Sequence, residues 1–186
     1  MKICMKDQNN NDIVLWDYQR RLVNKINVSD NNLFIASRQL GITTLLRYVA
    51  VKNLLSGHRV VYMSTQTEQN RMFLLGVKKI LYDNGHSYQS DIDRLMVGND
   101  GVISTKSDDC DLLLIDGGSI PHQIKFDRSV VVGYPHQSLS DIRGDCDKEF
   151  DVEILKWSSN PNMDDEWKTS MIENIGIVNF NKEYIT

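Results

Sequence analysis

The hydrophobic residues of this chain recur in one order: a short apolar run, then a polar turn, then an amphipathic segment. Short apolar runs are typical of strands buried in a sheet, whereas apolar residues three and four positions apart are typical of helices that bury one side. The expected strands cover residues 33–36, 59–63, 102–104, 112–115, 130–132 and 152–157, the last alternating as an edge strand does. The expected helices cover residues 18–26, 43–56, 68–82 and 164–174. This alternation predicts an α/β fold with a mainly parallel sheet and helices on both of its faces.

Capping and turn residues set the expected boundaries of the first helix. Asp17 is the expected N-cap of the first helix, and Asn31 and Asn32 form the expected turn after it. Residues 1–12 are polar, and we expect a loose, flexible lead-in there, followed by one domain over residues 13–186.

Composition narrows the class of protein without giving a function. The chain has 186 residues, enough for one domain. No apolar run approaches the roughly 18 residues of a membrane helix, and the N-terminus has no apolar signal core, so we expect a cytoplasmic protein with no membrane partner. The three cysteines are scattered, which suits a reducing compartment.

The charge balance argues against direct DNA binding. Twenty-one basic residues face twenty-five acidic ones, for a net charge of −4, and no basic cluster stands out. Proteins that bind DNA without a partner usually neutralise its phosphates with a basic surface. We therefore expect any contact with DNA to be indirect and to need a protein partner or an oligomeric ring.

The most informative segment lies between the first expected strand and the second expected helix. A loop in this position can direct backbone N–H groups and a helix N-terminus at a phosphate. The usual pattern is glycine, four residues, glycine, lysine and a hydroxyl residue. Here Ala36 takes the first glycine position, Gly41 the second, Ile42 the lysine position and Thr43 the hydroxyl position. The alternative is a turn that binds nothing, since many α/β folds have a glycine at such a junction.

The sequence of this loop closely resembles the phosphate-binding loop of the large terminase subunits of tailed phages, the ATPases that pump DNA into procapsids. The motifs that carry the resemblance occur in the family's order: residues 15–20, 37–44, 112–116, 130–135, 165–167 and 180–184. The resemblance covers the family's ATPase domain and not the metal-dependent nuclease domain that follows it there. It implies a three-layer RecA-like fold.

The resemblance also implies a set of site residues. The nucleotide-binding residues would be Gln19, which reads the adenine edge in the family, together with Ser37, Arg38, Gln39, Leu40, Gly41, Ile42, Thr43 and Thr44. Thr43 and Asp116 would hold the magnesium ion of a bound ATP or ADP. Arg38 would be a cis-acting arginine, and Arg47 on the following helix is a second cation near the loop.

This sequence departs from the family pattern at positions where the family has catalytic and coupling residues. Ile42 stands where the family has the lysine that contacts the β and γ phosphates, and Gly117 stands where it has the water-activating glutamate. In the coupling motif, Gly133-Tyr134-Pro135 replaces the usual hydroxyl residues. No catalytic residue is therefore intact, and we expect weak nucleotide binding or none.

Four other groups of residues are weaker candidates. His122 and His136 lack the neighbours of a metal site, and residues 141–147 lack calcium-loop spacing, so we expect loop histidines and a solvated loop. Trp157 and Trp167 are expected to pack rather than stack on bases. The aspartates at 108, 109 and 111 precede an expected strand and are expected to form a solvated turn.

Three functions stay open on the sequence. The first is a catalytically degenerate, terminase-like phage protein that acts through contacts with the packaging machinery or a terminase. The second is an ATPase subunit that a neighbouring subunit completes in trans. The third is a helicase-derived fragment. The sequence of the loop and the lack of later helicase motifs argue against it.

Overall fold

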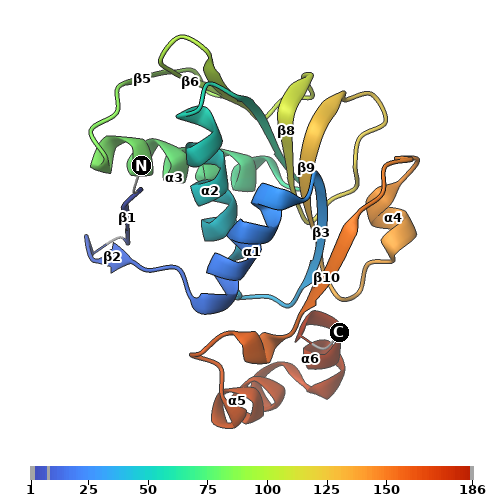
Figure 1. Cartoon of the computed structure of the whole chain (residues 1–186). Coiled ribbons are helices and arrows are strands. Elements are labelled where there is room, and N and C mark those ends of the chain that lie inside the picture. Colours follow the sequence, from blue (N-terminus) through green and yellow to red (C-terminus); the bar gives the residue numbers. More distant parts are fainter. Residues whose placement is uncertain (1–2, 8, 185–186) are drawn as a thin grey trace.

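The computed structural model describes residues 3–7 and 9–184, and within them the main sheet has eight strands in the order β10-β3-β9-β8-β4-β7-β6-β5 (Figure 1). All neighbours from β10 to β7 are parallel, and beyond β7 the strands β6 and β5 extend the sheet in antiparallel pairs. The strands are β3 (Asn31–Ala36), β4 (Arg59–Ser64), β5 (Tyr88–Ser90), β6 (Arg94–Val97), β7 (Gly101–Ser104), β8 (Cys110–Asp116), β9 (Phe126–Gly133) and β10 (Asp151–Leu155). The predicted α/β class and mainly parallel sheet are confirmed.

Three helices cover one face of the sheet: α1 (Asp17–Val28), α2 (Ile42–Leu54) and α3 (Thr67–Asp83). Alternate residues of the central strands, such as Phe34, Tyr62, Leu114 and Val132, bury their side chains in one cluster with these helices. Since side chains alternate across a strand, Asp116 lies on this same face of the sheet, at the end of β8.

The opposite face is covered by the short helix α4 (Leu139–Arg143) and by the chain between β8 and β9. The prediction of a solvated loop over residues 141–147 is wrong at Ile142, which is 1% exposed. Ile142 lies so close to Gly133 that a Cβ atom there would be 2.2 Å from its Cδ1 atom. Glycine at 133 therefore allows α4 to pack against the sheet.

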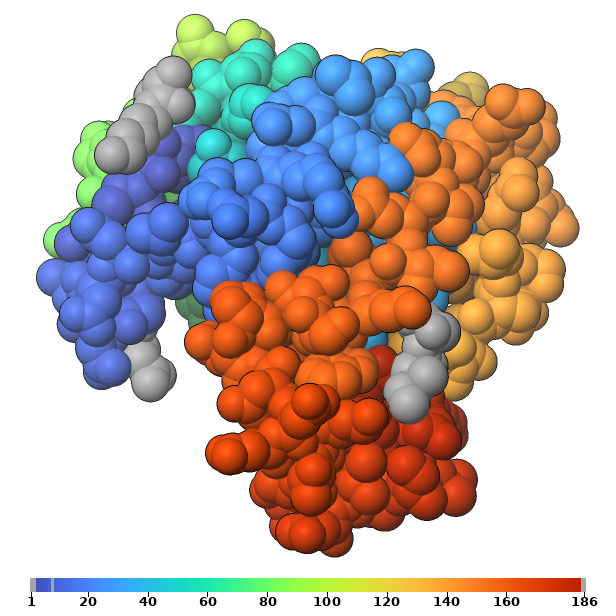
Figure 2. Space-filling view, turned by 60° about the horizontal axis from the view of Figure 1, so that its bottom comes forward, coloured from blue at the N-terminus to red at the C-terminus, as the bar shows by residue number. Residues whose placement is uncertain are grey.

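The C-terminal residues form a small lobe, coloured red in Figure 2, from α5 (Asp165–Ile175) and α6 (Ile177–Tyr184). Trp157, in a single 3-10 turn (Trp157–Ser159), has its ring 5.8 Å from that of Trp167, which lies 5.3 Å from Tyr184. Phe180 is fully buried among these rings. The packing role expected of the two tryptophans is confirmed, although Trp157 follows the strand rather than ending it.

The remaining differences from the expected elements are local. The expected turn at Asn31 and Asn32 is wrong, because both residues begin β3 and pair with β9. Asp17 is the first helical residue of α1 rather than its cap. In the expected lead-in, β1 (Met5–Lys6) pairs with β2 (Asp12–Ile13), and Met5 is buried against the core; its flexibility stays a prediction.

No helix in the described residues is both long enough and apolar enough to cross a membrane.

Two isoleucines offer a matched test of this core. Ile103 on β7 is fully buried, whereas Ile92, between β5 and β6, is 73% exposed. We expect Ile103→Ala to lower the free energy of unfolding by about 2–5 kcal/mol, through lost burial and the cavity left behind. Ile92→Ala is expected to change it by about 0.5 kcal/mol or less. Urea denaturation of both variants measures the difference, and equal effects would contradict the assignment of this face to the core.

Candidate functional site

A cavity of about 690 Å³ opens where β3, β8 and β9 end. Parallel strands bring their carboxyl ends to one edge of a sheet, which is where α/β folds bind ligands. The cavity is lined by residues 36–43, by the first turns of α3 with Glu68 and Gln69, and by Asp116, Tyr134 and Tyr184. The predicted loop and the predicted aspartate thus share one cavity.

The loop turns its carbonyl groups away from the cavity and into the protein. The carbonyl oxygen of Gln39 accepts a hydrogen bond from the buried side chain of Asn160 at 2.9 Å. The carbonyl oxygen of Leu40 accepts from the Tyr18 hydroxyl, and those of Leu40 and Gly41 accept from Gln19 Nε2 at 3.3 and 3.2 Å. Because C=O and N–H point in opposite directions across a trans peptide, the N–H groups of the next residues point the other way.

The backbone angles agree with an anion-binding loop. Gln39 and Gly41 both have a positive φ, 62° and 64°, whereas Leu40 between them does not. Alternation of this kind makes successive N–H groups converge on one point, as in backbone nests that bind anions. Gly41 is also the N-cap of α2 and has no side chain to cap the helix, so the first N–H groups of α2 stay available.

Gln19 supports this loop from behind. Its side chain is 4% exposed, and its Oε1 atom accepts a hydrogen bond from the backbone N–H of Trp16 at 3.0 Å. Gln19 does not line the cavity. Both ends of the amide are therefore used to hold the protein backbone, and adenine reading by Gln19 stays a prediction.

Asp116 accepts hydrogen bonds from side chains of the cavity wall and from Tyr62 behind it. Thr43 Oγ1 donates to Oδ2 at 2.8 Å, Tyr62 OH to Oδ2 at 3.3 Å and Tyr134 OH to Oδ1 at 3.2 Å. Burial, followed by the nearby negative charge of Asp116, raises the pKa of Tyr134 to about 12 and that of Tyr62 further. The two phenols therefore stay protonated at neutral pH and donate to the carboxylate.

The oxygen atoms of Thr43 and Asp116 suit magnesium, which prefers hydroxyl, carboxylate and water ligands. A threonine that donates its proton to Asp116 keeps a lone pair for a metal ion. The residues present therefore fit the metal of a bound nucleotide. Among the described residues, no cluster of three or more histidine, cysteine or acidic side chains forms a separate metal site.

Positive charge is scarce in this cavity. Ile42 lines it and provides none, and Arg38 is paired with Glu183 of α6. Arg38 also lies over the ring of Tyr134, 5.7 Å from its centre. Arg47 is outside the lining and donates to the carbonyl oxygen of Met72 at 2.9 Å, so it does not replace the lysine.

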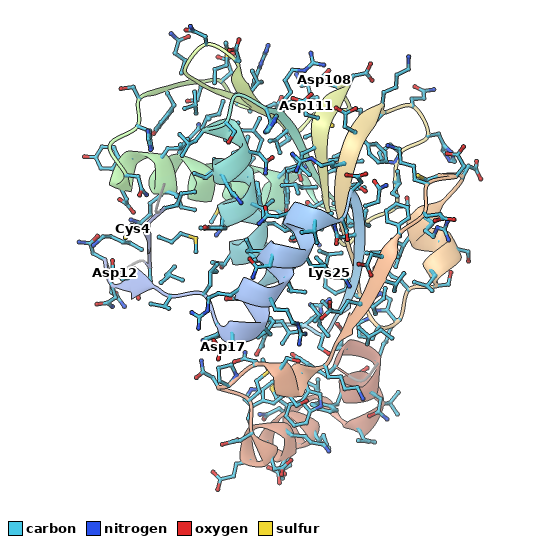
Figure 3. The ribbon with its side chains drawn as sticks, in the orientation of Figure 1. Cys4, Asp12, Asp17, Lys25, Asp108 and Asp111 are labelled. Atoms are coloured by element: carbon cyan, nitrogen blue, oxygen red, sulfur yellow. The ribbon has the colours of Figure 1, made fainter. Side chains whose placement is uncertain are left out.

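The other candidates from the sequence lie elsewhere. Figure 3 shows Asp108 and Asp111 at the amino end of β8, opposite the end that carries Asp116. Asp111 there accepts a hydrogen bond from the backbone of Arg59. His122 pairs with Asp145 at 3.1 Å, and His136 stacks on Tyr134 with ring centres 6.2 Å apart. Thr44 follows the loop but does not line the cavity.

Solved structures were compared with the whole chain. The ATPase domain of the large terminase of Thermus phage P74-26, in a mutant form, matches with a TM-score of 0.68 over 92% of this chain and 93% of that one, at 15% identity. The unmutated domain matches with a TM-score of 0.65 at 13% identity, covering 92% of both chains. The fold is that of a phage large terminase ATPase domain. The large terminase of bacteriophage HK97 has a TM-score of 0.60 at 12% identity, over 76% of this chain and 37% of that one.

No family model and no curated protein matches the chain. The likeness at this level of identity concerns the fold, which is the terminase-like, RecA-like fold expected from the sequence motifs.

Sequence reasoning missed several residues that line the cavity or hold the groups in its wall. Asn160, Tyr62, Gln69 and Tyr184 come from segments distant in the chain, and no local spacing marks them. The sequence marks Tyr134 only as part of the altered coupling motif. An aromatic residue directly after an apolar strand is the signal that could have indicated a cavity wall.

The support of the loop by Gln19 can be tested by its removal. Gln19→Ala removes one of the two donors to each of the Leu40 and Gly41 carbonyl groups and leaves the N–H of Trp16 without its partner, so we expect the free energy of unfolding to fall by about 1–3 kcal/mol. Gln123→Ala, at an exposed position, is the control and is expected to change it by about 0.5 kcal/mol or less. Chemical denaturation measures both, and an equally small effect of the two changes would contradict the supporting role.

The raised pKa of Tyr134 predicts a loss of stability in alkali. The unfolded chain loses the phenolic proton near pH 10, whereas the folded chain keeps it up to about pH 12. The unfolded state then binds fewer protons in this window, so the free energy of unfolding falls as the pH rises. Tyr134→Phe is expected to make that fall less steep in denaturation curves recorded between these pH values. Equal slopes for both proteins would contradict it.

Proposed function

We propose that this chain is a terminase-like phosphate-loop domain that binds a magnesium nucleotide weakly, does not hydrolyse it at the rate of a motor, and acts through protein contacts. The observation that carries the proposal is the orientation of the loop, whose carbonyl groups are held by Asn160, Tyr18 and Gln19. This arrangement favours an anion on the cavity side of the loop.

Several groups would contact the nucleotide. The N–H groups of residues 40–43 would donate to phosphate oxygens, and Arg38 would add a positive charge once it leaves Glu183. Thr43 and Asp116 would hold a magnesium ion, which neutralises phosphate charge when it is bound. The absent lysine is expected to weaken binding about tenfold to a hundredfold, the value of one charge-assisted contact.

Hydrolysis requires more than binding. Loss of one preorganised charge donor lowers a rate by about 10²–10³, and loss of a general base by about 10²–10⁴. Such losses are not additive when residues act as a unit. Ile42 and Gly117 offer neither charge nor base, so even the smaller single loss leaves turnover too slow to drive DNA translocation.

Partners are inferred from charge and fold together. The net charge of −4 argues against direct DNA binding, and the neighbours in fold are a phage large terminase and the ATPase domain of another. We therefore propose a protein partner from the packaging machinery or a terminase, with DNA contacted only through it.

A second candidate is an ATPase subunit that a neighbouring subunit completes in trans. The retained Thr43–Asp116 pair and the open cavity favour it, because a partner side chain could enter from solvent. It predicts hydrolysis only in an assembly. Lack of activity with portal, DNA and a full-length terminase would remove this candidate.

Restoring the lysine tests the proposal. Ile42→Lys places an ammonium group at the loop, and we expect the affinity for magnesium-ATP, measured by calorimetry, to rise about tenfold to a hundredfold. Ile154→Lys adds the same charge on the exposed face of the edge strand β10 and is the control, with no gain in affinity. No detectable binding by the Ile42→Lys protein, or an equal gain in the control, would contradict a phosphate site at this loop.

A further inference from the structure

Gly117 lies directly after the metal-orienting aspartate, in a conformation that few side chains adopt. Its φ is +80°, and a Cβ atom built on it would lie 2.5 Å from Cε2 of Tyr134 and 3.4 Å from two further ring atoms. Atoms do not approach this closely in real structures, so one of the two residues would have to move. The aromatic ring of Tyr134 therefore occupies the volume of a side chain at position 117.

Tyr134 is held in place from several sides. Its hydroxyl donates to Asp116 Oδ1 at 3.2 Å, and its backbone N–H donates to Gln137 Oε1 at 2.8 Å. The guanidinium group of Arg38 lies over one part of the ring, and the imidazole of His136 stacks near another. The ring cannot make room for position 117 without disturbing its contacts with Asp116, Arg38 and His136.

We propose that Tyr134 is a positioning residue that keeps a water-activating side chain out of position 117, so that Gly117 and Tyr134 act as a pair that leaves a bound nucleotide intact. This inference rests on the proposed function, because it assumes a nucleotide in the cavity. It adds that hydrolysis is prevented by the bulk of the Tyr134 ring as well as by the lack of a carboxylate at position 117. A glutamate placed at 117 does not restore hydrolysis while the ring of Tyr134 remains.

The steric part can be tested without any nucleotide. Gly117→Ala is expected to lower the melting temperature clearly more than Gly85→Ala, because Gly85 has a similar φ of +74° but no atom within 4 Å of the added Cβ. Combined with Tyr134→Ser, Gly117→Ala is expected to lower the melting temperature no more than Gly85→Ala does. Additive effects of Gly117→Ala and Tyr134→Ser in this double-mutant cycle would overturn the proposal.

The functional part uses single-turnover hydrolysis of magnesium-ATP, with all variants made in the Ile42→Lys protein. Neither Gly117→Glu alone nor Tyr134→Ser alone is expected to raise the rate. Together they are expected to raise it about a hundredfold or more, the usual effect of a positioned general base. A rise with Gly117→Glu alone, or none with the pair, would overturn the role of Tyr134.

Calorimetry on the same variants separates the two claims. Absence of nucleotide binding in every variant would refute the proposed function, whereas the melting-temperature cycle would still decide whether Tyr134 closes position 117. Binding that persists, together with the additive cycle, would leave the proposed function standing and remove the inference about Tyr134.

Discussion

The cavity of this domain depends on how three side chains hold one loop. Asn160, Tyr18 and Gln19 bind the carbonyl groups of residues 39–41, and this fixes the direction of the peptide N–H groups between them. Two residues with positive φ make that path possible. A carbonyl group turned toward the cavity would instead repel an anion, so these partners favour anion binding.

Binding and catalysis need different parts of such a site, and we propose that this chain keeps only those for binding. The backbone N–H groups and the Thr43–Asp116 pair would hold an anion and a metal ion. In this proposal Ile42 and Gly117 provide neither charge nor base, and the ring of Tyr134 fills the space beside Gly117.

The sequence predicted what local patterns encode. The apolar runs of β3, β8 and β9 located the sheet, and the glycine at 41 with Thr43 located the loop, because strand, turn and helix signals adjoin there. Long-range contacts escaped prediction. Asn160 meets Gln39 across 121 positions of sequence, and Tyr134 meets Gly117 only because β8 and β9 are neighbours. The short helix α4 and the buried role of Ile142 were missed for the same reason, since five residues carry too little periodicity.

The rate of ATP hydrolysis by the purified chain tests the central claim most directly. It is measured at a magnesium-ATP concentration at which calorimetry shows the site to be occupied, so that slow turnover cannot be ascribed to an empty cavity. The separation of binding from catalysis predicts a rate far below about 1 per second, the lower range of ordinary enzymes. Turnover at or above that rate by the isolated chain would contradict it.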